Sequence, residues 1–262
     1  MDAQGWAPLH FACWNGHLEV ARELLARGAK IEAKDKNGYT ALHIASSNGH
    51  AAVVRLLLDA GAQIEAKGSE GAAPLYLASH SGHLEVVRLL LERGAVVDAR
   101  IATGSTSLVF ASENGHAAVV RKLLARGADV NARDNGGRTA LHYASYSGRA
   151  EAMRELLKRH DVDIDAQDGD GYTPLIDACW KGRLMAATIL IGAGADLALL
   201  DNAGRSALFL AEWLVQEDAQ APAAPPAALP AAGAAPSPAV ITKAQRAEHK
   251  VIVALLKARG AA

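Results

Sequence analysis

A single leucine-centred phrase recurs along this chain. It reads Ala-Pro-Leu-His-Phe-Ala at 7–12, Thr-Ala-Leu-His-Ile-Ala at 40–45 and Thr-Pro-Leu-Ile-Asp-Ala at 173–178. The leucines of the phrase recur every 33 residues, with one interval of 34: Leu9, Leu42, Leu75, Leu108, Leu141, Leu175 and Leu208. A fixed period of this length predicts stacked supersecondary units, each of which needs a neighbour to bury its apolar face. Such a stack presents a long repetitive surface and no deep central cavity.

Residues 35–67 show what one unit contains. Asp35-Lys36-Asn37-Gly38 is typical of a turn, and Thr40 is suited to begin a helix because its hydroxyl can accept from a free backbone amide. Asn48-Gly49-His50 ends that short helix. A longer apolar helix follows and ends at Gly61, a residue suited to a left-handed cap. The unit is therefore predicted as turn, short helix, turn, longer helix and return loop.

These phrases resemble the ankyrin repeat. The resemblance includes the Leu-His phrase, a Gly-His pair seven to eight residues later, an apolar run such as Val-Val-Arg-Leu-Leu-Leu and a closing Gly-Ala-Asp-Val-Asn-Ala. It implies an all-α ankyrin-repeat solenoid of stacked helix-turn-helix units with projecting hairpin-like loops. Six repeats are expected at 2–34, 35–67, 68–100, 101–133, 134–167 and 168–200, and an interrupted seventh begins at Asp201.

The seventh repeat is expected to be split by an insertion. Residues 1–217 are predicted to hold six repeats and the first helix of the seventh. Residues 218–241 form an Ala/Pro-rich segment that contains six of the nine prolines, a composition typical of a flexible or polyproline-like insertion. Residues 242–262 then begin with a capping-box pattern, Thr242 to Gln245, and carry Val251, Ile252, Leu255 and Leu256 on one stripe. This helix is expected to complete and cap repeat seven.

Two departures from the repeat pattern carry expectations of their own. His160-Asp161 stands where other repeats have the capping glycine, which puts the local stability there in doubt because Asp takes the left-handed conformation less readily than Gly. Asp177 stands where other repeats have apolar residues, among them Phe11 and Tyr143. We interpret Asp177 as an edge carboxylate that reaches solvent and has no catalytic role.

Charge and hydropathy exclude several classes of function. Lys and Arg total 27 and Asp and Glu total 28, so the strong basic excess usual in a nucleic-acid-binding protein is missing. The sequence has no uninterrupted apolar run of about 18 residues, so no membrane span is expected. No secretory leader is seen. We expect a monomer in the cytoplasm or nucleus.

The chemistry-bearing residues do not predict an enzyme. Cys13 and Cys179 fall five repeats apart, too far to form a disulfide. The recurring histidines share repeat positions and are expected to form hydrogen bonds at helix starts and between repeats, because their spacing does not suit one metal ion. No phosphate loop, His-Glu-x-x-His or Cys-x-x-Cys motif is present. We therefore expect no catalytic residues, no metal, no cofactor and no small-molecule substrate.

The resemblance places a partner-binding surface on the positions that vary between repeats. Aromatic and arginine side chains are common in binding hot spots. The predicted partner-binding residues are Trp6, Trp14, Lys34, Tyr39, Lys67, His80, Arg100, Glu113, Arg133, Arg138, Tyr146, Tyr172 and Trp180. An alternative is that Trp14 and Tyr39 belong to an uncovered end of the stack, since terminal repeats need a polar outer face.

Four of these residues, Lys34, Lys67, Arg100 and Arg133, share the last position of the return loop, and we call them the basic ladder. One interpretation is that the basic ladder selects an acidic segment of a partner protein. The other is that the four charges are merely solvated. Arginines at helix C-terminal ends, such as Arg27 and Arg126, are already explained by the helix dipole, whereas the basic ladder is not.

Two other functional classes remain beside a general interaction scaffold. By resemblance to the ankyrin proteins of proteasome assembly, the chain could be a regulatory subunit or assembly chaperone that clamps one folded partner. It could bind nucleic acid through the basic ladder, although the near-zero net charge argues against this. By family resemblance, Asn131 also stands where ankyrin asparagines can be hydroxylated.

Overall fold

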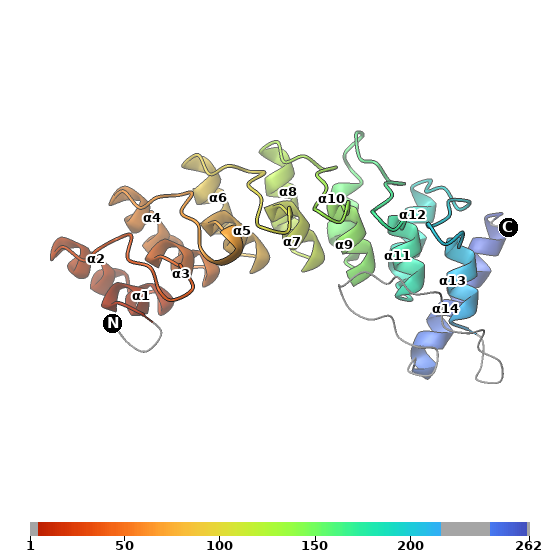
Figure 1. The fold of residues 1–262 in the computed structure, drawn as a ribbon, viewed down its shortest axis with the longest axis horizontal. Coiled ribbons are helices and arrows are strands. Elements are labelled where there is room, and N and C mark those ends of the chain that lie inside the picture. Colours follow the sequence, from red (N-terminus) through yellow and green to blue (C-terminus); the bar gives the residue numbers. More distant parts are fainter. Residues whose placement is uncertain (1–4, 216–241, 261–262) are drawn as a thin grey trace. The chain divides into compact units, whose positions relative to one another are not determined.

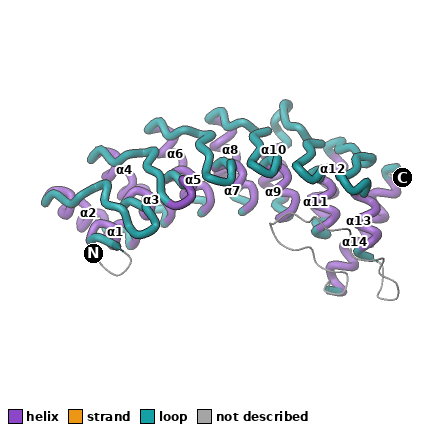
Figure 2. The backbone as a smooth tube through the Cα atoms, viewed as in Figure 1, coloured by secondary structure: helices purple, strands orange, loops and turns teal. Residues whose placement is uncertain are grey.

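The computed structural model describes residues 5–215 and 242–260 and contains helices and loops without a named strand in those ranges. The chain divides into two compact units, Met1–Asn135 and Gly136–Ala262. Figure 1 shows the order of the helices within each unit, and Figure 2 separates the helices from the loops that join them. The all-α solenoid of paired helices predicted from the 33-residue period is confirmed.

Unit 1 consists of four helix pairs and one short 3-10 turn, Ser69–Gly71. Within each pair the first helix is shorter than the second, as the sequence pattern predicts. Neighbouring first helices pack on one another, and so do neighbouring second helices. The pairs are α1 (Pro8–Trp14) with α2 (Leu18–Ala26), α3 (Ala41–Ser47) with α4 (Ala51–Asp59), α5 (Pro74–His80) with α6 (Leu84–Glu92), and α7 (Ser107–Glu113) with α8 (Ala117–Ala125).

Unit 2 has three helix pairs over its described residues, and the last pair is interrupted in the sequence. These pairs are α9 (Ala140–Ser147) with α10 (Ala150–Leu156), α11 (Pro174–Trp180) with α12 (Leu184–Gly192), and α13 (Ala207–Trp213) with α14 (Lys243–Ala258). The first helix of repeat seven, expected to reach about Glu217, ends at Trp213. The predicted flexible insertion, 218–241, lies outside the described residues.

The histidine of the Leu-His phrase fixes the start of each first helix that carries it. His43 Nδ1 accepts from the backbone N–H of Thr40 at 3.1 Å, and its Nε2 donates to the carbonyl of Ala72 in the next repeat at 3.0 Å. His142 in unit 2 does the same with Thr139 and Tyr172. The expectation that these histidines bond at helix starts and between repeats is confirmed. Each such imidazole satisfies a free helix amide and joins two repeats.

A second histidine column lies over the glycine of the preceding repeat. His83 Nε2 donates to the carbonyl of Ser47 at 2.9 Å, and its ring lies so close to Gly49 that an added Cβ would stand 2.6 Å from Nδ1. His50 and His116 repeat this contact within unit 1. Gly49 also has a φ of 79°. Glycine is therefore required here for two reasons, its backbone conformation and the space that the imidazole fills.

Helix α14 packs against α12 and α13. Its residue His249 lies over Gly182, where an added Cβ would stand 2.4 Å from the imidazole Cε1. This contact corresponds to the one between His83 and Gly49, so α14 lies where the second helix of a repeat lies. The predicted capping box is present, because Thr242 N–H donates to Gln245 Oε1 at 2.9 Å and Gln245 N–H donates to Thr242 Oγ1 at 3.2 Å.

The buried stripe of α14 is narrower than predicted. Ile252 and Leu256 are fully buried, Leu255 is half-buried, and Val251 is 50% exposed. Val251 was expected on the buried stripe, and that expectation is wrong. Residues 252 and 256 are four apart, which places them on the side that meets α12 and α13, whereas Val251 is rotated away from that side.

Repeat five avoids the backbone strain that its sequence suggests. Among the described residues, Glu70 alone combines a side chain with a positive φ, so Asp161 does not take the left-handed conformation. Helix α10 has 7 residues where α8 has 9, and the chain leaves it through a turn in which Arg159 Nη2 pairs with Asp161 Oδ2 at 2.9 Å. The extra residue of this repeat is absorbed in the loop.

Projecting loops follow the return segments in both units. Isolated antiparallel bridges join Arg100 to Thr106 in unit 1 and Leu200 to Ser206 in unit 2, which gives these loops a hairpin form. Neighbouring loops also bond to each other: the N–H of Ala102 donates to the carbonyl of Glu70 at 2.7 Å. These bonds give the loops of a unit a fixed spacing, so side chains at matching positions form ordered rows.

Candidate protein-binding surface

One hollow on the first-helix side of unit 1 spans three repeats. We call it the aromatic groove, and its volume is about 390 Å³. Its walls come from the segment before α1, the end of α1, the loop before α3, helix α3 and helix α5. The lining residues are Trp6, Trp14, Asp35, Asn37, Tyr39, His43, Ile44, Ser47, Asn48 and Leu77. Three predicted binding residues, Trp6, Trp14 and Tyr39, are therefore brought together.

Two tryptophans form one end of the aromatic groove. The ring centroids of Trp6 and Trp14 lie 5.5 Å apart with a 55° angle between the planes. Trp6 also makes an edge contact with Phe11 at 5.1 Å, which holds its indole in place. Trp14 stays 51% exposed. An indole this exposed at the edge of a hollow is typical of a binding hot spot, because it offers large apolar area with few rotatable bonds.

Carboxylates lie near Tyr39 and Tyr76 on the first-helix side of unit 1. Burial raises the pKa of Tyr39, and the negative charges of Asp35 and Glu70 raise it further. Burial likewise raises the pKa of Tyr76, with added contributions from Tyr39, Glu70 and Glu113. Burial lowers the pKa of His43 to about 4, so its imidazole is neutral at neutral pH. The charges of nearby carboxylates therefore act on both tyrosines, in addition to burial.

The uncovered end of unit 1 adjoins the aromatic groove at Trp6, which lines both the groove and the larger hollow at this end. Hollows of about 520 Å³ and 310 Å³ lie along α1 and α2 and are lined by residues that include Pro8, Phe11, Val20 and Leu24. Trp14 and Tyr39 line neither of these two hollows. The alternative that these two residues belong to an uncovered end is therefore not favoured by their positions.

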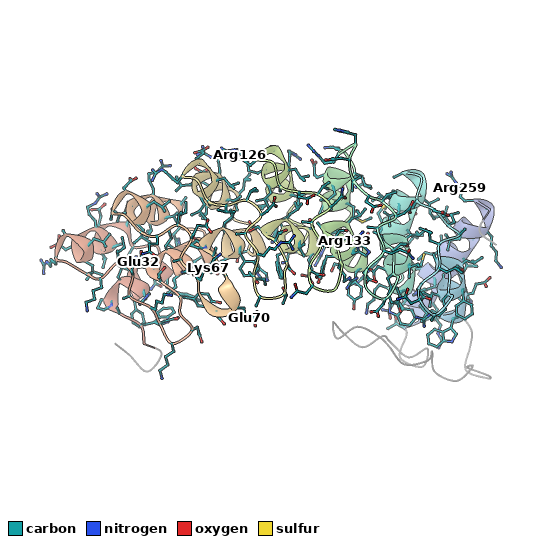
Figure 3. The ribbon with its side chains drawn as sticks, turned by 45° about the horizontal axis from the view of Figure 1, so that its top comes forward. Glu32, Lys67, Glu70, Arg126, Arg133 and Arg259 are labelled. Atoms are coloured by element: carbon teal, nitrogen blue, oxygen red, sulfur yellow. The ribbon has the colours of Figure 1, made fainter. Side chains whose placement is uncertain are left out.

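The basic ladder lies on the return loops of unit 1, and all four side chains are exposed. Figure 3 labels two of them, Lys67 and Arg133, on the loops between the hairpin tip at Glu70 and the helix end at Arg126. Lys34 Nζ donates to the carbonyl of Lys67 at 3.0 Å. Arg100 Nη1 donates to the carbonyls of Gly104 at 2.7 Å and Arg133 at 2.5 Å. Two members of the ladder thus fasten the next return loop.

An uncharged residue does the same in unit 2. Gln167 Nε2 donates to the carbonyls of Gly171 at 3.0 Å and Leu200 at 2.9 Å. The bond to the next return loop therefore needs a donor and no positive charge. The sequence interpretation missed this role because the acceptor is a backbone carbonyl 33 residues away. Lys67 Nζ also lies 3.8 Å from Glu65 Oε2, but the bonds between return loops do not themselves require the positive charge of the basic ladder.

Arg138 is not available on the surface as the structure places it. Its side chain is 8% exposed and forms an ion pair with Asp177. Its guanidinium carbon lies 4.9 Å from the ring centre of Tyr143 and 5.4 Å from that of Tyr146. Asp177 is buried as well, so the expectation of a solvent-exposed edge carboxylate is wrong. Burial raises the pKa of Asp177 to about 7, and the Arg138 charge opposes that rise.

Tyr172 and Trp180 were expected on the binding surface and are also buried. The hydroxyl of Tyr172 accepts from Arg205 Nη2 at 2.8 Å. Trp180 stacks on Trp213 with a centroid distance of 5.8 Å and a 19° angle. Both side chains stabilise contacts between consecutive repeats of unit 2, so their exposure was predicted wrongly.

The remaining predicted residues lie at or near the surface. His80 is exposed beside Phe110, with ring centroids 5.9 Å apart, and Glu113 is half-buried. Tyr146 is half-buried in unit 2 under Lys181, whose Nζ lies 4.4 Å from the ring centre. The sequence interpretation missed Tyr76 and Phe110, which meet edge to face at 4.8 Å. The available signal was an aromatic residue on each of two neighbouring first helices, Tyr76 on α5 and Phe110 on α7.

The described residues contain no group of three or more His, Cys, Asp or Glu side chains placed to hold a metal ion. Cys13 and Cys179 are each buried and free, and burial raises the pKa of both thiols to about 12. Such thiols are poor nucleophiles and poor metal ligands. Over the described parts of the chain, no helix combines the length and apolar character that crossing a bilayer requires.

Stacked helix pairs joined by hairpin loops define a helical repeat protein. A family model described as ankyrin repeats (3 copies) matches residues 9–101, 66–134 and 108–201. The chain belongs to the ankyrin-repeat family. It is similar to the crystal structure of the human ASB11 ankyrin repeat domain, with 29% identity and a TM-score of 0.73, over 78% of this chain and 91% of that chain. No curated protein sequence matched significantly.

Proposed function

We propose that this chain is a non-enzymatic interaction scaffold, acting as a monomer inside the cell, and that unit 1 binds a segment of a partner protein in the aromatic groove. Ankyrin repeats are in general protein–protein interaction modules. The observation that carries the proposal is Trp14, a large aromatic side chain that stays 51% exposed at the edge of the groove. Burying such a ring on binding contributes about 1.5–3 kcal/mol from its apolar area.

The basic ladder adds a selection for charge. Gln167 shows that the bond between return loops forms without a positive charge, yet unit 1 has Lys or Arg at all four ladder positions. Exposed charges contribute little to the free energy of folding. They do raise the association rate and bias the choice of partner. We propose that the basic ladder binds an acidic stretch of the partner segment.

The groove is tested by partner recovery from the native source with tagged full-length chain. Trp14→Ala, alone and with Tyr39→Ala, is compared with Phe209→Ala on α13. Phe209 is the matched control because it is 50% exposed, against 51% for Trp14. The proposal expects at least a tenfold loss of partner for the groove variants and unchanged recovery for Phe209→Ala. Equal recovery by all variants would contradict it.

The ladder is tested with Gln in place of all four bases, because Gln keeps the donor that fastens the next loop. The expected result is weaker partner binding with a shallower dependence on salt and an unchanged melting temperature. A set with Glu at the same positions should bind more weakly still. Unaltered binding by both sets would contradict the selection for acidic segments. Binding to duplexes of any sequence that falls steeply with salt would favour nucleic acid instead.

A further inference from the structure

The charges around the aromatic groove differ in sign from the basic ladder. Among the described residues that line the groove, the one charged side chain at neutral pH is Asp35, since His43 is buried and neutral. The positive charge of Lys34 contributes to the lowered pKa of His43, and the Lys34 ammonium donates to the carbonyl of Lys67. The inference drawn from this difference rests on the proposed function and specifies which side chain of the partner enters the groove.

The Asp35 carboxylate is held in place by its own turn. Its Oδ1 accepts from the N–H of Asn37 at 2.8 Å and from the N–H of Tyr39 at 2.9 Å. These two bonds use one carboxylate oxygen and orient the group beside the groove. Glu70 and Glu113 add negative charge, because both contribute to the raised pKa of Tyr76, and Glu70 also contributes to that of Tyr39.

The aromatic rings point to the same sign of ligand. The face of an aromatic ring is negative, and a positive group within about 6 Å of it is attracted, most strongly by tryptophan. Trp6 and Trp14 are tilted at 55° with centroids 5.5 Å apart, so the two indoles form a corner and not a stacked pair. Tyr39 lines the same groove. A volume of about 390 Å³ lies at the small end of the range for ligand sites, which is roughly 300–1,000 Å³.

We propose that the aromatic groove of unit 1 binds a lysine or arginine side chain of the partner segment, with its positive group against the indoles of Trp6 and Trp14 and near the Asp35 carboxylate. The alkyl stem of such a side chain packs on Ile44 and Leu77, and the charged end meets the aromatic faces. The partner segment then carries mixed charge: a base that enters the groove and acidic residues that face the basic ladder.

The test uses the full chain and four small probes in two matched pairs. The pairs are N-acetyl-arginine methylamide with its citrulline analogue, and N-acetyl-lysine methylamide with its norleucine analogue. Each pair has nearly the same shape and differs in charge. The readout is the indole N–H resonances of Trp6 and Trp14 during titration. The buried, stacked Trp180 and Trp213 of unit 2 serve as an internal reference.

The charged probe of at least one pair is expected to bind roughly two- to fivefold more tightly than its neutral analogue, the range for an exposed cation–π contact. Trp14→Leu keeps an apolar side chain and should abolish the preference. Asp35→Asn keeps the oxygen that accepts from Asn37 and Tyr39 and should reduce it. Phe209→Leu should leave it unchanged. If Trp14→Leu does not fold, the charge preference measured with Asp35→Asn decides the test.

Equal affinity for charged and neutral probes would overturn the inference, and so would a preference that Asp35→Asn and Trp14→Leu both leave intact. The outcome is distinct from that of the partner-recovery test. If Trp14→Ala loses the partner protein but the probes show no charge preference, only the inference is overturned and the proposed function stands. A charge preference with unchanged partner recovery overturns the proposed function and leaves the groove a cation site without that partner.

Discussion

At the scale of residues, the fold depends on polar pairs that single positions do not reveal. Arg138 stands where other repeats have Trp6 or Tyr39, and Asp177 stands where they have Phe11 or Ile44. Each alone looks like a polar residue on a variable surface. In the structure they form one buried ion pair between consecutive repeats. Asp177 departs from the apolar residues of its column, and Arg138 lies one repeat before it with the opposite charge. That combination was the signal that could have predicted this pair.

Breaking the buried pair should be costly. Arg138→Gln leaves Asp177 buried without its cation, and such a loss typically destabilises by about 3–5 kcal/mol. Arg138→Tyr with Asp177→Leu introduces residue types found at these positions in other repeats and should cost less. Asp177 is then removed, and Asp168, the second carboxylate beside Arg138 at 3.6 Å, still accepts from the N–H groups of Asp170 and Tyr172. Urea unfolding of the two variants and the wild type measures the difference. Equal destabilisation by both variants would contradict this account of the pair.

His43 predicts a specific loss of stability in acid. Burial lowers its pKa from 6.5 to about 4, so the unfolded chain binds a proton that the folded chain resists. Its contribution to the free energy of unfolding is complete above pH 6.5 and is lost as the pH falls toward 4. The shift corresponds to about 3 kcal/mol at most. His43→Gln should remove this part of the pH dependence between pH 7 and pH 4; an identical slope in variant and wild type would be the contrary result.

At the scale of elements, the contact between a glycine and the imidazole of the next repeat locks one helix pair on the other. The same contact recurs at α14, where His249 covers Gly182. A helix that begins far along the sequence from α13 thus makes the contact of an ordinary second helix. In repeat seven, the column of His50, His83 and His116 falls on position 216, and His249 follows 33 residues later. This offset is visible in the sequence, whereas the contact between His249 and Gly182 is a property of the packed structure.

Gly49→Ala and Gly61→Ala should separate packing from backbone strain. Both glycines have a positive φ, 79° and 88°, so both substitutions cost about 1–2 kcal/mol for the left-handed backbone. A Cβ at Gly49 meets the His83 ring, whereas a Cβ at Gly61 meets nothing within 4 Å. Gly49→Ala should therefore lower the midpoint of chemical unfolding clearly further than Gly61→Ala. Matching midpoints would show that the imidazole contact is easily relaxed.

Adjacent positions of α14 test its docking. Ile252 is fully buried and Val251 is 50% exposed. Ile252→Ala should destabilise by about 2–5 kcal/mol, the range for truncating a buried aliphatic side chain, whereas Val251→Ala should change the free energy of unfolding by less than about 1 kcal/mol. Amide exchange of α14 and α13 should speed up together in Ile252→Ala. Similar small effects for both substitutions would mean that α14 is not held as described.

At the scale of the whole molecule, the repeat period determined most of the fold and little of the recognition. Helix order, caps and the histidine bonds follow from local patterns that recur, so the sequence predicted them. Which variable side chains stay exposed depends on neighbours in the next repeat, and there the sequence interpretation failed for Arg138, Tyr172 and Trp180. Trp6, Trp14 and Tyr39 were predicted from the same columns and do line one groove.

The central claim is that the aromatic groove is where a partner protein binds. The most direct measurement places a photo-crosslinking phenylalanine derivative at position 14 or, as the control, at position 209, and identifies crosslinked proteins in the native source by mass spectrometry. We expect a protein that is crosslinked from position 14, is lost on adding excess wild-type chain and is absent from position 209. The same products from both positions, or none from position 14, would contradict it.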